Sequence, residues 1–413
     1  MAEIMAGTTP GTPRVLRAMN DRAALDLLLE HGPLSRTRIG KLTGLSKPTA
    51  SQLLARLEAA GLVVATGTAA GRPGPNAQLY AVNASAAHVA GLDVNAHRIV
   101  AAVADVTGET VGRFELRTPG RRADSVVRQV TGALDGAVKD AGLTRSDVHR
   151  VVIGTPGAFD PGTGRLRYAS HLPGWHSPTL LDELAAVLPM PVEYENDVNL
   201  VAVAEQRLGA ARGHDDFVLL WNEEGLGAAL VINGRLHRGF TGGAGEVGFL
   251  PVPGAPLVRQ VTKANAGGFQ ELAGAQVLAR LARELGIEDE AVRGSGTHHE
   301  IAAALVGRAA GAVADGEEEG GPYGRLLDQF ATGLATGLAS MVAVLDPEIV
   351  VLSGELFSAG AEPLRARVAA ELAQLAASRP RLIAGDVTDR PVLRGALESA
   401  LATTRDEVFD TSR

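Results

Sequence analysis

Apolar residues recur at helical spacing through the first 60 positions of the chain, in three short runs. The first predicted helix should end near Gly32-Pro33. A second helix, from about Arg36 to Thr43, has Ser35 as a suitable N-cap, and a third is capped by Ser46 and runs to Ala60. The apolar face of the first helix consists of Leu25, Leu28 and Leu29. The spacing therefore predicts three short helices joined by tight turns.

The third predicted helix has two different faces. Its buried face consists of Ala50, Leu53, Leu54 and Leu57. The opposite face carries small or hydrogen-bonding side chains, which suit base edges in a major groove, and its N-terminus attracts phosphate. The alternative is a packing unit with a solvated face. The pattern favours the second helix of a helix-turn-helix and predicts DNA contacts from Lys47, Thr49, Ser51, Gln52 and Arg56.

Two short strands follow this helix and flank a tip rich in Gly and Pro. The strands are predicted at Leu62–Val64 and Gln78–Val82, and the tip reads Gly71-Arg72-Pro73-Gly74. The tip keeps the backbone thin, so we expect Arg72 to enter a narrow A·T minor groove. Together the helices and the hairpin predict a winged helix-turn-helix domain over residues 1–84 that binds a double-stranded DNA operator.

From His88 onward the pattern changes to alternating strands and helices. Strands are predicted at 89–94, 99–104, 111–116 and 151–154, with a helix near 123–141, and a second cycle has strands at 217–220, 228–233 and 349–352. This alternation predicts an α/β chain with two related lobes facing a cleft. We expect the lobes at 85–205 and 206–413, with the C-terminal helix, near 396–408, returning to the first lobe.

Charge divides the chain in the same way. Residues 1–90 carry 9 Lys and Arg against 5 Asp and Glu, whereas the remainder carries 30 against 42. A basic head on an acidic body suits a nucleic-acid-binding module joined to a domain that need not touch phosphate. The chain has no cysteine, which excludes disulfides, thiolate catalysis and Cys-ligated zinc. No run of about 18 apolar residues is present and no signal core begins the chain, so we expect a cytoplasmic protein without a membrane partner.

Five motifs follow one another along the two predicted lobes. They are Gly154-Thr155-Pro156-Gly157-Ala158-Phe159-Asp160, Leu172-Pro173-Gly174-Trp175, Glu195-Asn196-Asp197-Val198-Asn199, Ala244-Gly245-Glu246-Val247-Gly248, and Leu345-Asp346-Pro347-Glu348 before Ser353-Gly354. In this order the motifs resemble those of the ROK family of repressors, open reading frames and sugar kinases. The resemblance covers nearly the whole chain and implies an actin-like (ribonuclease-H-like) sugar-kinase fold with sugar held between the lobes.

The sugar-binding side chains implied by this resemblance are present. Asp197 matches the catalytic base of the family's kinases. The alternative is that these side chains are inherited and only stabilise loops. The implied sugar-effector residues are Asn196, Asp197, Glu246 and Glu271.

The phosphate-binding elements implied by the resemblance are altered. The family's Asp-x-Gly-Gly-Thr is here Asp93-Val94-Asn95-Ala96-His97, and its second phosphate loop is occupied by Glu223-Glu224-Gly225. Carboxylates beside a triphosphate repel it unless a metal bridges them. We therefore expect no ATP cofactor and no catalytic residue.

The family's zinc site is altered too. Its Cys-rich pattern falls on Thr262–Asn265, Phe269 and Glu271, and its histidine falls on Phe249, so no metal is expected. Phe249 and Phe269 are hypothesised to fill that volume. The pair His298-His299 lies in a Gly-rich stretch and is predicted to be solvated.

The leading function is a transcriptional regulator, most often a repressor in this family, controlled by a sugar-like effector. Ligand between the lobes would change the spacing of two winged helices in a homodimer or homotetramer. Two alternatives stay open: an ATP-dependent sugar kinase with a fused DNA-binding domain, and a regulator governed by a protein partner rather than a small molecule.

Overall fold

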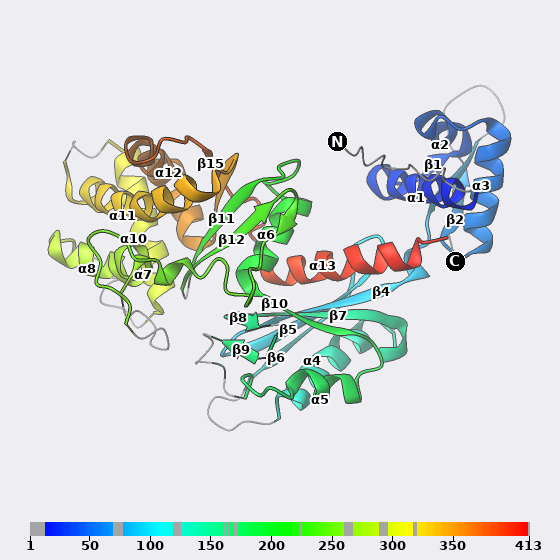
Figure 1. Ribbon diagram of the computed structural model, residues 1–413, viewed down its shortest axis with the longest axis horizontal. Coiled ribbons are helices and arrows are strands. Elements are labelled where there is room, and N and C mark those ends of the chain that lie inside the picture. The colour runs from blue at the N-terminus through cyan, green and yellow to red at the C-terminus, as the bar shows by residue number, and fades with distance from the viewer. Residues whose placement is uncertain are drawn as a thin grey trace, which may run out of the picture.

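The computed structural model describes residues 13–68, 77–118, 125–160, 162–163, 165–167, 172, 174–223, 225–259, 267–288, 296–316 and 320–411. The chain forms a small N-terminal head and two larger α/β lobes, and one long helix, α13 (Pro391–Val408), runs between them (Figure 1). This arrangement confirms the predicted fold class.

The head contains three helices and a three-stranded sheet in the order β1-β3-β2. Ser35 Oγ accepts a hydrogen bond from the Arg38 N–H at 3.3 Å, and Ser46 Oγ accepts one from the Thr49 N–H at 3.4 Å. Both predicted N-caps are therefore confirmed. The elements are α1 (Pro13–His31), β1 (Leu34–Ser35), α2 (Arg36–Thr43), α3 (Lys47–Ala59), β2 (Val63–Thr68) and β3 (Gln78–Val82).

The first lobe is built on a five-stranded sheet in the order β10-β7-β4-β5-β6. Alternate residues of these strands face two different cores, one towards α4 and one towards α13 and α6. The strands are β4 (His88–Val94), β5 (Arg98–Asp105), β6 (Thr110–Arg117), β7 (Val148–Thr155) and β10 (Val192–Asn196); the helices are α4 (Val126–Asp140), α5 (Leu180–Val187) and α6 (Asp197–Leu208); β8 (Ala158–Asp160) and β9 (Arg165–Arg167) form a separate hairpin.

The second lobe repeats this plan with a sheet in the order β13-β12-β11-β14-β15. One helix, α11 (Pro322–Leu345), is long and apolar enough to resemble a membrane span, but it is a core helix whose Phe330, Leu334 and Leu338 are fully buried. The remaining elements are β11 (Phe217–Asn222), β12 (Leu226–Ile232), β13 (Arg235–Leu236), α7 (Phe269–Ala273), α8 (Gln276–Glu284), α10 (His298–Ala314), β14 (Ile349–Ser353), α12 (Glu355–Leu375) and β15 (Arg381–Ala384).

Helices α6 and α13 form a layer between the two sheets. One continuous core joins β4 and β5, these two helices, and β11 and β14. The helices cross closely at Gly395, where a Cβ would lie 1.8 Å from the Leu200 carbonyl oxygen. Only glycine fits there, so this position fixes the contact between the two helices.

The far end of α13 joins the head. Phe409, which follows the helix, is 1% exposed and belongs to the same core as Leu25 and Leu57. Asp406 Oδ1 lies 2.7 Å from Arg22 Nη1, and the Thr411 hydroxyl lies 3.0 Å from the Asp21 carboxylate. The end of α13 and the residues just after it therefore pack against the N-terminal head.

A single buried carboxylate ties together the two places where the chain crosses between lobes. Glu205 is fully buried near the end of α6. Its Oε2 accepts the N–H groups of Ala210 at 2.9 Å and Asp386 at 3.1 Å, and its Oε1 accepts that of Val387 at 3.0 Å. Ala210 leads from α6 into the second lobe, and residues 386–387 lead back towards α13.

Replacing Glu205 with Gln should destabilise the protein by about 2–3 kcal/mol, because an amide N–H₂ would face a backbone N–H and leave it unpaired. Urea unfolding measures this loss. Glu284→Gln, at an exposed position on α8, is the matched control and should change stability little. Equal stability of the two variants would contradict the role assigned to Glu205.

Candidate functional site

The outer face of α3 presents the side chains expected to read DNA. Lys47, Thr49 and Gln52 are exposed, and Ser51 is half-buried with its hydroxyl donating to the Lys47 carbonyl at 2.9 Å. The buried stripe of the same helix packs against α1 and α2. The head thus holds α3 from behind and leaves its polar face open.

Arg56 has a structural partner that the sequence did not indicate. Its Nη2 lies 2.6 Å from Asp21 Oδ1 on α1, and the Asp21 side chain is only 3% exposed. This ion pair fixes the last turn of α3 to α1 while leaving the Arg56 side chain 41% exposed. The Arg56 side chain therefore orients α3 through its ion pair with Asp21. Arg72 lies outside the described residues.

A cavity with a volume of about 870 Å³ lies between the lobes. Its lining draws on both sheets, on the start of α6 and on the start of α13. Ligand pockets of this size are common in proteins. Its ionisable lining residues are Asp93, Arg98, Arg167, His176, Asp197, Glu223, Glu246, His299 and Arg390.

Asn196 and Asp197 stand at the junction of β10 and α6, inside this cavity. Asn196 caps α6 by accepting the Asn199 N–H at 3.1 Å and donates to the Gly157 carbonyl at 3.1 Å. Asp197 Oδ1 accepts the Val198 N–H at 2.8 Å. Burial, with a smaller contribution from the charges of Asp93, Glu246 and Glu223, raises the pKa of Asp197 to about 8, although the hydrogen bond from Val198 opposes the shift.

Two further carboxyl groups share the cavity. Burial raises the pKa of Glu246 to about 7. Burial also raises the pKa of Asp93 to about 6, although the positive charges of Arg98 and Arg390 oppose the shift. Carboxyl groups that are protonated near neutral pH can donate as well as accept hydrogen bonds. The cavity thus offers mixed partners for a polyhydroxyl ligand.

Glu271 lies apart from the other three expected sugar residues. It is on α7, its carboxylate is 3.6 Å from the Arg280 guanidinium, and it does not line the cavity. The structure therefore brings Asn196, Asp197 and Glu246 together and places Glu271 beside Arg280.

The sequence interpretation missed several lining residues. His298 and His299 begin α10 rather than lying in a loop, and His299 lines the cavity. A capping box between Thr297 and Glu300 marks this helix start, and its Thr-x-x-Glu spacing was visible in the sequence. Arg98, Arg167 and Arg390 carried no such local signal.

The altered phosphate elements also face the cavity. The Asn95 side chain closes the β4–β5 turn by accepting the N–H groups of His97 at 2.9 Å and Arg98 at 3.0 Å. Glu223 lines the cavity, while Glu224 lies outside the described residues. The side-chain oxygen of Asn95 is thus used by the turn, and the carboxylate of Glu223 lines the cavity from the second lobe.

The region of the family's zinc site is only partly described. Residues 262–265 lie outside the described part of the chain. Phe269 is fully buried in the core of the second lobe, and Phe249 is half-buried and lines the cavity. Within the described residues, no group of three or more His, Cys, Asp or Glu side chains is placed to hold a metal ion.

Comparison with known families identifies both parts of the chain. The ROK family model matches residues 89–403, and a MarR family model matches residues 12–72. The chain belongs to the ROK family. A MarR-type winged helix joined to a ROK domain is the construction of a DNA-binding transcriptional regulator.

Individual relatives agree with this assignment. The xylose repressor of Caldicellulosiruptor bescii is 26% identical over 358 residues, which cover 84% of this chain and 87% of that protein. A crystal structure of a ROK family transcriptional regulator, a homologue of E. coli MLC protein, shares the fold with a TM-score of 0.71, covering 96% of this chain and 98% of that one at 18% identity. A ROK hexokinase from Thermus thermophilus, 27% identical with a TM-score of 0.61, covers 77% of this chain and 99% of its own.

The protein should become less stable as pH rises through the neutral range. The folded state keeps the Asp197 proton up to a pKa of about 8, whereas an ordinary Asp loses it near 3.8. The free energy of unfolding therefore falls between these two values and levels off above the higher one. Asp197→Asn should reduce this decline in urea unfolding at pH 6, 7 and 8, and Glu284→Gln should not. A decline of unchanged steepness in Asp197→Asn would rule out this origin.

Proposed function

We propose that this protein is a cytoplasmic transcriptional repressor whose affinity for operator DNA is set by a sugar-like effector in the cavity between the lobes. The observation that carries the proposal is the path of α13. Pro391 and Val392 at its start line the cavity, and Phe409 beyond its end is buried in the DNA-binding head. Helix α13 thus connects the cavity to the core of the head, which positions α3, so a structural change at the cavity can reach α3.

The chemistry of the cavity supports a polyhydroxyl effector. Asn196, Asp197 and Glu246 line this cavity and supply hydrogen-bond acceptors, and the two carboxyl groups also supply donors when they are protonated. Hydroxyl groups of a sugar can satisfy such groups in both directions. The xylose repressor and sugar kinases among the relatives agree with this class of ligand.

The same cavity is poorly suited to a nucleotide triphosphate. Glu223 contributes negative charge, and the residues at 94–97 carry side chains where the family's kinases have glycines. Like charges in an enclosed site repel by several kcal/mol at about 4 Å if the effective dielectric constant is near 20. We therefore propose that the protein is not catalytic and uses no cofactor.

Regulation would follow from lobe closure. In a homodimer or homotetramer, two heads must match two half-sites separated by about one helical turn of DNA. An effector that favours one closure angle shifts the population of the DNA-binding arrangement. By linkage, operator DNA weakens effector binding by the same factor that the effector weakens DNA binding.

A sugar kinase with a fused DNA-binding head is the second candidate. Asp197 is half-buried and lines the cavity at the position that resembles the catalytic base of the family's kinases, and the ROK hexokinase from Thermus thermophilus has a similar fold. Its observable signature is sugar-dependent release of ADP from ATP.

Two substitutions on α3 should weaken DNA binding in different ways. Lys47→Ala removes a phosphate contact, so it should weaken binding to all duplexes and lower the salt slope by about 1. Gln52→Ala should lower affinity about tenfold for an operator selected from random duplexes and little for unrelated duplexes, since base contacts carry specificity. Fluorescence anisotropy measures both, with exposed Arg379→Ala as control. Loss of equal size on every duplex for both variants would refute the base-reading role of Gln52.

A panel of sugars should identify ligands that stabilise the protein thermally and release it from its operator. Glu246→Gln should weaken both responses to the same sugar, because it alters a cavity hydrogen-bonding group without touching the head. Mobility shift and thermal unfolding report the two effects, and a coupled ADP assay runs alongside. Sugar-dependent ADP release would replace the regulator with the kinase, and operator release without any sugar response would leave a partner-controlled regulator.

A further inference from the structure

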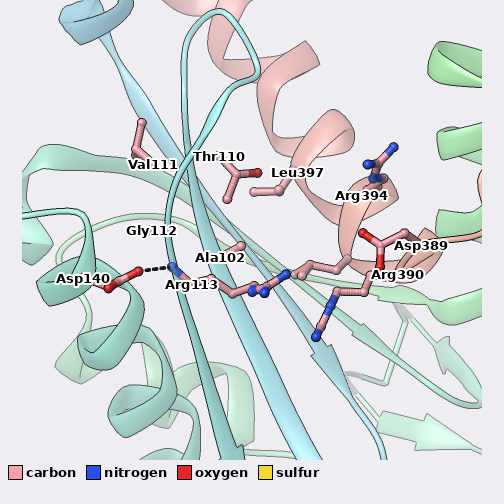
Figure 2. Close-up of a pocket in the computed structure, with 11 residues that line it drawn as sticks. Ala102, Thr110, Val111, Gly112, Arg113, Asp140, Asp389, Arg390, Arg394 and Leu397 are labelled. Carbon is pink, nitrogen blue, oxygen red and sulfur yellow. Dashed lines mark hydrogen bonds between the residues drawn. The ribbon is translucent and has the colours of Figure 1, made fainter.

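A second pocket, of about 450 Å³, opens on the first lobe between the edge strand β6 and the first turns of α13. Figure 2 shows Arg113 reaching from β6 towards the start of α13. Only Arg390 lines both this pocket and the central cavity among their described lining residues. The apolar lining residues of this second pocket are Ala102, Val111, Leu393 and Leu397.

Three guanidinium groups from separate parts of the chain line this pocket. Arg113 comes from β6, Arg390 immediately precedes α13, and Arg394 lies in its first turn. Within the described residues, neither Arg113 nor Arg394 forms an ion pair, and Arg390 has a carboxylate of Glu115 only at 4.0 Å. The guanidinium groups are therefore available to a ligand.

The acidic side chains of the pocket only partly balance this charge. Asp140 is already engaged, because its Oδ2 accepts the Arg113 backbone N–H at 2.9 Å. Asp389 is exposed. Three Arg against two Asp leave one net positive charge on the lining.

The start of α13 adds to the attraction for an anion. Arg390 provides no side-chain cap, and Pro391 occupies the first turn. The first N–H groups of a helix have no partner within it, and the helix dipole places partial positive charge there. Arg390 also adopts a left-handed backbone conformation, with φ 49° and ψ 54°, which is strained for a residue other than glycine.

We propose that this pocket binds a small organic phosphate. Guanidinium groups pair with phosphate oxygens through two parallel hydrogen bonds, and the apolar floor accommodates a short carbon skeleton. The volume falls within the range of small-molecule sites. Arg390, shared with the central cavity, gives the bound phosphate a direct electrostatic route to Asp93.

The test uses the full-length protein and two probes, inorganic phosphate and glycerol 1-phosphate, with glycerol as the neutral control. Isothermal titration calorimetry at constant ionic strength should show saturable binding of one glycerol 1-phosphate per chain, weaker binding of phosphate, and none of glycerol. Arg113→Ala and Arg394→Ala, both at exposed positions, should each weaken binding about tenfold. Arg379→Ala, equally exposed, should leave it unchanged.

Location is decided by one further variant, Glu246→Gln in the central cavity. If phosphate binds beside α13, Glu246→Gln leaves its affinity unchanged. If phosphate enters the central cavity instead, removal of that carboxylate strengthens binding while Arg113→Ala and Arg394→Ala have no effect, and the proposal is overturned. Absence of saturable binding also overturns it. Neither result bears on operator or sugar binding, so the proposed function stands or falls separately.

Discussion

The carboxylate of Glu205 holds together the two segments by which the chain crosses between the lobes. The chain passes from the first lobe to the second after α6 and returns before α13, and Glu205 accepts backbone N–H groups from both crossings. A Cβ at Gly385 would lie 2.5 Å from its Oε1, so the returning segment must pass close to it. A fully buried carboxylate is tolerable only because these N–H groups satisfy it.

That constraint explains why a cavity can exist between the lobes without loosening the fold. The pKa of Asp197 is raised first by burial and also by the charges of Asp93 and Glu246 in the same cavity. Such a cluster weakens a fold unless something else holds its walls. Here the walls are anchored by the α6–α13 layer and by Glu205. The carboxyl groups of Asp93, Asp197 and Glu246 can therefore stay in the cavity, where a ligand can supply hydrogen-bond partners.

The sequence predicted what depends on neighbours in the chain. Caps at Ser35 and Ser46 and the stripe from Ala50 to Leu57 follow from spacing alone, and the structure has all of them. Contacts between distant residues could not be predicted in this way. Glu205 bonds to residues 181 and 182 positions away, and the Arg56–Asp21 pair depends on how three helices pack. Spacing carries no information about such contacts.

The expected site shows the same division. Asn196 and Asp197 are adjacent in sequence, so any fold that exposes one to the cavity brings the other near it. Glu271 was inferred only from resemblance to a family whose zinc-site pattern falls on the same part of the chain. In this chain the zinc-ligand positions have changed, and the structure places Glu271 beside Arg280 and outside the cavity lining. A residue role inferred from a family holds only where the interactions that position the residue are also present. Helix α13 shows the opposite case, a role that no sequence motif indicated. Its role comes from Pro391, Gly395 and Phe409, whose places at the cavity, the helix crossing and the head core are visible only in three dimensions.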